Sequence, residues 1–345
     1  MPDGSKFDDL GLLALVRSCN SPFKQDWDVE QLIAEVEQNL GTTVVDIPML
    51  YNGSNDYGFH LKLDNRPDVV VRPARGEMNM PKFDGFPLAV QASEVAFEAA
   101  TYSLLLSQFE IKSSKLLYHR IPKRCEGSGQ ARSINLVGRR FMVFEQAESQ
   151  DYVWRSLDQA GECAEIRAAL LNFDVLYEFA TSWLRERLFE QTPDKLPIGV
   201  ASTRDFCVGL FTSKIEATIK KIGDMIGWES DRNTVGPRAA AAKISLLKVI
   251  PHILPPEDGD KPLIYRLVLE HGDFGTHNMS VKIDSDGTPV VTSLYDWETG
   301  CITPALLSDT TISIVSGNLT TADNAVPVVS RVKKGCDGRR ACRAC

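Results

Sequence analysis

Two short stretches, His271–Asn278 ("HGDFGTHN") and Tyr295–Glu298 ("YDWE"), decide how this sequence is interpreted. The apolar run "PLIYRLVLE" leads into the first, and "PVVTSL" leads into the second. A hairpin-like arrangement of these runs would bring Asp273, Asn278 and Asp296 together, because each lies where a strand gives way to a loop. Carboxylate and amide oxygens suit Mg²⁺, which usually keeps water and phosphate in its other positions. The residue types therefore indicate phosphate chemistry.

The composition is that of a globular protein large enough to bury a core, with 345 residues, of which 43% are hydrophobic and 24% charged. A formal net charge of −8 argues against nucleic-acid binding, which normally needs a basic face. The N-terminus lacks the positive region of a signal peptide, and no run approaches the roughly 20 apolar residues of a membrane span. We therefore expect a cytoplasmic protein that binds neither nucleic acid nor membrane.

The chain changes in texture along its length, after an expected N-terminal helical extension over residues 1–41. Residues 42–147 contain strand-like runs around one helix-like segment, "PLAVQASEVAFEAATYSLLLSQF", which predicts a small mixed sheet with a helix packed on it. Residues 148–315 are mainly helical in pattern, since apolar residues recur at three and four. The basic, cysteine-containing tail, 316–345, has no apolar period and is expected to be disordered. The predicted class is α+β.

The two opening motifs resemble those of the aminoglycoside phosphotransferase and choline kinase family, small-molecule kinases with a protein-kinase-like fold. The resemblance implies two lobes, a sheet with one helix followed by a mainly helical lobe, and the use of ATP and Mg²⁺ to phosphorylate a small hydroxylated molecule. It implies Asp273 as the catalytic base and Asn278 and Asp296 as Mg²⁺ ligands. His271 is expected to support the loop, and Trp297 to pack.

The same resemblance assigns phosphate-binding residues in the first lobe. Arg72, in "DVVVRPA", stands where the family usually has a lysine that holds the α- and β-phosphates. Its planar guanidinium can bind phosphate through two bonds at once. The expected ion-pair partner is Glu98 on the following helix, with Glu94, one turn earlier, as the competing acid.

Other nucleotide contacts are implied in two loops. Gly53, Ser54 and Asn55 lie where a nucleotide-covering loop is expected, although Asn-Gly alone predicts a hairpin turn. In "FMVFEQA", the backbone of Glu145 and Ala147 is expected to bond the adenine edge. Downstream, Asp309 resembles the family's structural aspartate, which braces the catalytic loop.

Several functional alternatives stay open. The family's helical lobe normally continues well past the metal motif, so the resemblance implies a shortened C-terminal lobe here. The main alternative is therefore a catalytically impaired pseudokinase or nucleotide-binding module of the same fold. A hydrolase with a metal cluster of Asp273, His277 and Asp296 is a second. A protein kinase is disfavoured because "HGD" stands where His-Arg-Asp is usual. The acceptor is not encoded in a recognisable motif, but an acidic lobe would suit a cationic one such as an amino sugar or choline.

Overall fold

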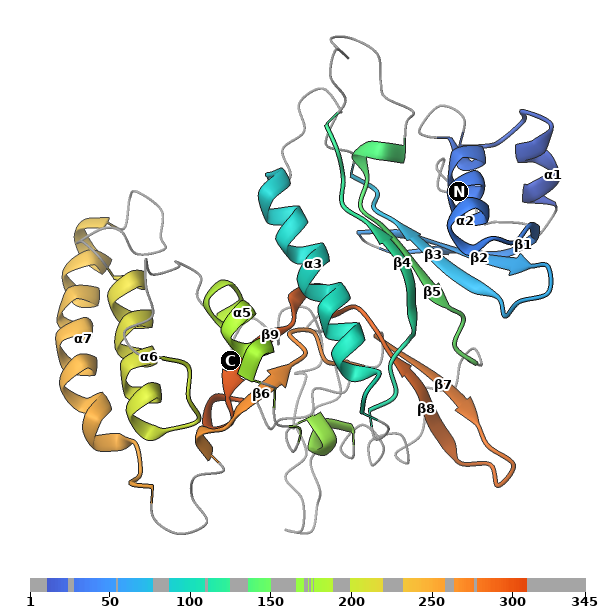
Figure 1. Cartoon of the computed structure of the whole chain (residues 1–345). Coiled ribbons are helices and arrows are strands. Elements are labelled where there is room, and N and C mark those ends of the chain that lie inside the picture. The colour runs from blue at the N-terminus through green and yellow to red at the C-terminus, as the bar shows by residue number, and fades with distance from the viewer. Residues whose placement is uncertain are drawn as a thin grey trace, which may run out of the picture. The chain divides into compact units, whose positions relative to one another are not determined.

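The computed structural model forms two compact units, Met1–Ser156 with Asn278–Glu298, and Leu157–His277 with Thr299–Cys345 (Figure 1). Among the residues that the structure describes, no helix is both long and apolar enough to cross a membrane. The structure describes residues 11–23, 28–53, 55–76, 87–108, 111–124, 136–149, 166–170, 173, 175, 177–188, 199–219, 232–257, 264–275 and 278–308.

The first unit contains a five-stranded sheet in the order β1-β2-β3-β5-β4. Every pairing is antiparallel, so the prediction of a mixed sheet is wrong in this respect. Strands β3 and β4, which α3 (Leu88–Leu105) connects, run parallel to each other but are not neighbours in the sheet. Strand β5 lies between them and pairs antiparallel with both. The strands are β1 (Val44–Asn52), β2 (Tyr57–Leu63), β3 (Val69–Pro73), β4 (Leu116–Arg120) and β5 (Phe141–Glu145).

Helices cover both faces of this sheet, because successive side chains of a strand point to opposite faces. On one face, Val71 of β3 and Val143 of β5 join the apolar core formed with α1 (Leu12–Arg17) and α2 (Val29–Leu40). On the other face, the Phe144 ring of β5 meets the Tyr102 ring of α3 edge-on, with centroids 4.9 Å apart. Side chains of β3 that alternate with Val71 therefore point to the other face of the sheet, the one that α3 covers.

An ion pair between side chains, as well as apolar packing, joins the N-terminal helix α2 to the sheet. Asp28 caps α2 by accepting a hydrogen bond from the Glu30 amide, and Gly41 ends the helix in the left-handed conformation. Glu35 of α2 accepts hydrogen bonds at 2.6 and 3.2 Å from the Arg120 guanidinium of β4. Two bonds between a carboxylate and a largely buried guanidinium fix the helix on the sheet edge.

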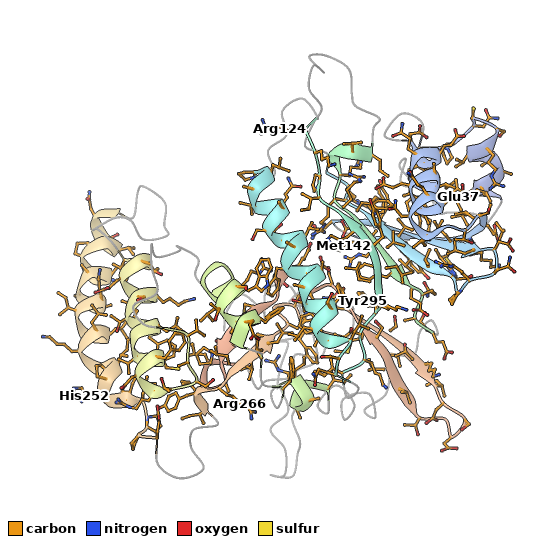
Figure 2. The ribbon with its side chains drawn as sticks, viewed as in Figure 1. Glu37, Arg124, Met142, His252, Arg266 and Tyr295 are labelled. Atoms are coloured by element: carbon orange, nitrogen blue, oxygen red, sulfur yellow. The ribbon has the colours of Figure 1, made fainter. Side chains whose placement is uncertain are left out.

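A hairpin of β7 (Met279–Ile283) and β8 (Pro289–Leu294) completes the first unit. Its turn is closed by Asp284, whose carboxylate accepts from the amides of Asp286 and Thr288. Gly287 adopts φ 83°, a conformation that costs glycine little. Tyr295 follows directly after β8, at the open end of the hairpin (Figure 2).

The second unit is mainly helical, with α5 (Tyr177–Leu188), α6 (Arg204–Thr218) and α7 (Arg232–Ile253). Thr203 caps α6 by accepting from the Phe206 amide. A two-stranded sheet of β6 (Leu267–Glu270) and β9 (Cys301–Pro304) lies in the same unit and leads directly into the HGD stretch. A strand-rich unit with one long helix and a largely helical unit confirm the predicted α+β class.

Candidate functional site

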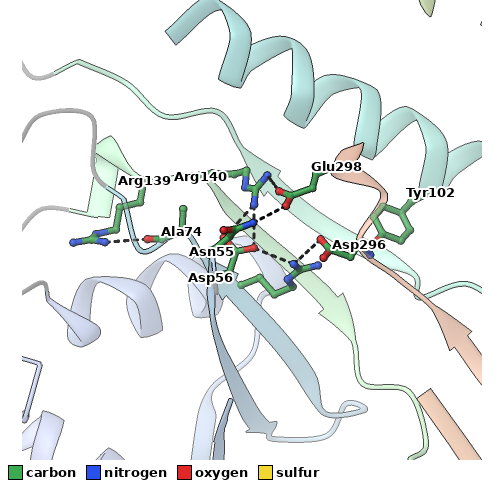
Figure 3. A network of polar contacts seen from close by, with 9 residues as sticks. Asn55, Asp56, Ala74, Tyr102, Arg139, Arg140, Asp296 and Glu298 are labelled. Atoms are coloured by element: carbon green, nitrogen blue, oxygen red, sulfur yellow. Dashed lines mark hydrogen bonds and ion pairs between the residues drawn. The ribbon is translucent and has the colours of Figure 1, made fainter. Parts of the chain in front are cut away.

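Strand β3 places Arg72 on the face of the sheet that α3 covers. Its Nη2 atom donates hydrogen bonds to the carboxylates of Asp56 and Asp296, each at 2.9 Å (Figure 3). Burial alone would lower the pKa of Arg72, but the neighbouring carboxylates of Asp56 and Asp296 raise it well above its usual value. Arg72 is thus a permanently charged group held between two acids from distant segments.

Asp296 has a backbone conformation that is rare for a residue with a side chain. Its φ is 71°, in the left-handed region that Asp and Asn tolerate better than most residues. Its amide N–H donates to the Tyr102 hydroxyl at 3.0 Å, which ties this loop to α3 (Figure 3). Such backbone outliers often occur at functional sites.

The β7–β8 hairpin brings Asn278 and Asp296 to the same end. The Asn278 carbonyl accepts a hydrogen bond from the Tyr295 amide at 3.0 Å, so the residue before β7 faces the residue that precedes Asp296. A buried amide and a partly exposed carboxylate fit a magnesium ion that takes its other ligands from phosphate and water. Within the described ranges, no group of three or more His, Cys, Asp or Glu residues is placed to hold a metal by itself.

Glu98 lies near Arg72 but does not form the expected ion pair. Its side chain is 1% exposed, and its Oε1 atom has no hydrogen-bond partner among the described residues. The carboxylates that Arg72 does bind are those of Asp56 and Asp296, so the predicted pairing with Glu98 is not present in this structure. Burial raises the pKa of Glu98 from 4.5 to about 7, against the opposing effect of Arg140 and Arg72.

This raised pKa predicts a pH-dependent stability. Between pH 4.5 and 7 the unfolded chain loses the Glu98 proton while the folded protein keeps it, so the stabilising effect present at low pH is lost as pH rises. Glu98→Gln should remove this dependence and gain up to roughly 3 kcal/mol relative to the wild type by pH 8. Urea unfolding across this pH range measures it, with Glu94→Gln on the same helix as control. Parallel pH profiles of wild type and Glu98→Gln would contradict the assignment.

The residues expected to form a nucleotide-covering loop lie in the turn between β1 and β2. Ser54 lies outside the described residues, whereas Gly53 and Asn55 are placed. A Cβ at Gly53 would lie 2.9 Å from the Asp56 carbonyl oxygen, so any other residue would shift the turn. The Asn55 amide donates to Glu298 at 3.0 Å, which links this turn to the segment of Asp296.

Two charged residues of this network, Asp56 and Arg140, were not predicted. The buried Asp56 carboxylate accepts from Arg72 and, at 3.0 and 3.1 Å, from Nη2 of Arg140. Arg140 also forms an ion pair of 2.5 Å with Glu298 (Figure 3). Strand alternation gave no signal for Arg140, since β5 buries Phe141 and Val143 as well as Met142 and Phe144.

The strand end proposed to bind adenine has one free donor. The Glu145 amide donates to the Lys115 carbonyl at 2.9 Å, so only its carbonyl could serve a base. The Ala147 carbonyl accepts from the Gln146 side chain at 2.9 Å. Within the described residues the Ala147 amide N–H has no acceptor, which leaves it available to a ligand.

The HGD loop belongs to the second unit, where Asp273 is exposed at the end of β6. The Asp273 amide donates to Nδ1 of the buried His271 at 3.3 Å, as expected of a histidine that supports the loop. A Cβ at Gly272 would overlap the Thr299 carbonyl oxygen, so the close approach requires glycine. His277 and Asp309 lie outside the described residues.

A buried arginine that sequence analysis missed lies behind this loop. Arg167 forms hydrogen bonds with Glu270, directly before His271, and with Ser308 at 3.3 Å. Its guanidinium lies 5.5 Å from the centre of the Phe274 ring. Arg167 therefore contacts the residues on both sides of the His271–Asp273 turn.

Comparison with known proteins finds similarity among solved structures alone. No family model matches the sequence, and no curated protein matches it. The structure of aminoglycoside phosphotransferase APH(4)-Ia matches at 15% identity, covering 80% of this chain and 73% of the other, with a TM-score of 0.43. Macrolide 2′-phosphotransferase MphH from Brachybacterium faecium matches at 12% identity, with coverages of 80% and 74% and a TM-score of 0.39. Amicoumacin kinase hAmiN, in complex with AMP-PNP and Ca²⁺, matches at 12% identity, with coverages of 82% and 67% and a TM-score of 0.39. Each of these three proteins is a phosphotransferase or a kinase by its name, and each is similar to this chain at 15% identity or less.

Proposed function

We propose that this protein is an ATP-dependent phosphotransferase that moves the γ-phosphate of ATP to a hydroxyl of a small molecule. The observation that carries the proposal is the 2.9 Å ion pair between Arg72 and Asp296, which are 224 positions apart in sequence. The motifs assign one to the phosphates and the other to the metal. Both groups must reach the same polyphosphate, and the fold of the first unit places them side by side.

Each residue has a chemical task in this proposal. The acceptor oxygen forms a bond to the γ-phosphorus, the bond from that phosphorus to the β,γ-bridging oxygen breaks, and the acceptor proton passes to Asp273. Arg72 binds phosphate oxygens, and the Glu145 carbonyl and Ala147 amide bind adenine. Asp296 and Asn278 would hold Mg²⁺, which offsets the charge of the triphosphate.

The acceptor is proposed from charge alone. The chain carries a formal net charge of −8, and a binding site lined by negative charge raises the local concentration of cations. We infer a small hydroxylated acceptor, with cationic compounds such as amino sugars or choline as the first to be screened.

One observation favours a second candidate, a nucleotide-binding module without turnover. Arg72 is engaged with Asp296, and Glu98, its expected partner, is joined to it by no ion pair in the described structure. Such a protein would bind nucleotide but would not transfer phosphate.

A thermal-shift titration of the full chain with ATP tests the proposal, first with Mg²⁺ and then with EDTA. A ligand at one hundred times its Kd adds about 2.7 kcal/mol to the free energy of unfolding. If Mg²⁺ tightens nucleotide binding, ATP should raise the melting temperature more with Mg²⁺ than with EDTA. Radiolabel transfer to amino sugars and choline then separates the two candidates. No shift from folded protein would contradict both.

A further inference from the structure

We propose that Arg140 is a positioning residue of the candidate nucleotide and metal site, and this rests on the proposed function. Arg140 lies directly before β5 and contacts neither Arg72 nor Asp296 through a hydrogen bond in the described structure. Its bonds go to the residues beside them. It acts by holding two segments, the β1–β2 turn and the Asp296–Glu298 segment, in one arrangement.

Two arginines that share one carboxylate link the same two segments. We call each arginine with its two carboxylates a clamp: Arg72 with Asp56 and Asp296 is the first, and Arg140 with Asp56 and Glu298 is the second (Figure 3). Asp56 and Arg140 lie on either side of Ala74, which pairs with Asp56 and donates its amide to the Arg140 carbonyl at 2.9 Å. Each arginine therefore connects the β1–β2 turn to one acid of the Asp296–Glu298 segment.

Burial makes the second clamp important for the position of Asp296. The Arg140 side chain is 12% exposed and that of Glu298 is 17% exposed. Without Arg140, Glu298 would keep the hydrogen bond from Asn55 but would lose the charge that compensates its own. An uncompensated charge in a largely buried site is destabilising, which favours a movement of Glu298 toward solvent. Because Glu298 is two residues from Asp296, its movement would displace the backbone whose left-handed conformation directs Asp296 to Arg72.

The adjacent Arg139 supplies a matched control. It is also buried, but its Nη1 atom donates to the backbone carbonyls of Ala74 and Arg75. Arg139 thus supports the strand ends, whereas Arg140 binds the carboxylates of the network. Arg139→Met removes a buried guanidinium from the adjacent position and leaves the carboxylate contacts of Arg72 and Arg140 intact.

Calorimetric titration of the full chain with ADP, with Mg²⁺ and with EDTA, tests the inference. The measured quantity is the ratio of the two dissociation constants, a ratio that a purely structural role would not change. We expect at least tenfold tighter binding with Mg²⁺ for the wild type and Arg139→Met, and a ratio at least fivefold smaller for Arg140→Met. Arg140→Lys keeps the charge but not the fork, so its ratio should be intermediate and remains measurable if Arg140→Met does not fold.

A double-mutant cycle with Glu298→Gln identifies the route of the effect. If Arg140 acts through Glu298, the ratio for Arg140→Met with Glu298→Gln should fall no further than that for Arg140→Met. An Arg140 variant with the wild-type ratio, or independent effects in the cycle, would overturn the inference while the proposed function stands. A wild type whose ADP affinity ignores Mg²⁺ would overturn both.

Discussion

Asp273→Asn is expected to abolish phosphate transfer while nucleotide binding stays nearly unchanged. Asparagine has the shape of aspartate but cannot take the proton of the acceptor hydroxyl, and general bases typically contribute 10²- to 10⁴-fold in rate. The Asp273 backbone should keep its place. Its amide N–H donates a hydrogen bond to His271 Nδ1, and Gly272 lies close to the Thr299 carbonyl. The loss should therefore appear in kcat, with the KM for ATP preserved.

The measurement follows transfer from γ-labelled ATP to amino sugars and choline, and to water as the minimal acceptor. Asp205→Asn, at an exposed position of α6 in the same unit, is the control and should retain full activity. Unchanged turnover in Asp273→Asn would remove this residue as the base. Loss of ATP binding together with turnover would show that Asp273 supports the site instead of accepting a proton.

Asp296→Asn should remove the Mg²⁺ dependence of nucleotide binding. Asparagine tolerates the left-handed backbone at this position and can still accept a hydrogen bond from Arg72, so the loop should keep its conformation. It lacks the charge that a magnesium ligand supplies. We expect the ratio of AMP-PNP dissociation constants with EDTA and with Mg²⁺ to fall at least tenfold, about 1.4 kcal/mol in binding free energy.

Calorimetry with AMP-PNP provides the measurement, since this analogue separates binding from transfer. Asp286→Asn is the control, because Asp286 lies at the turn of the same hairpin and far along the strands from Asp296. If Asp296→Asn binds AMP-PNP with the same Mg²⁺ dependence as the wild type, Asp296 is not the ligand. Metal-free affinity should be kept or strengthened, since Arg72 loses an ionic partner.

The sequence by itself determined where several strands and one long helix form, and which residues lie at the open end of the β7–β8 hairpin. Strand periodicity located β2, β3 and β5, and the apolar pattern located α3, because these signals arise from residues that are neighbours in the chain. Asn278 and Asp296 could be placed together for the same reason, as they flank a single hairpin. The family resemblance also predicted Arg72 as the phosphate-binding cation, a role that stays a prediction.

Only the tertiary structure decided which groups meet. Alternation along a strand tells which face a side chain occupies but not what lies opposite, so Arg72 was paired with Glu98 instead of with Asp56 and Asp296. Arg140 was missed because its partner Asp56 is 84 positions away and becomes its neighbour only through the order of β2, β3 and β5. The raised pKa of Glu98 likewise depends on the burial of this residue of α3, which outweighs the opposing effect of Arg140 and Arg72. Contacts between distant segments follow from strand order, which local sequence patterns do not contain.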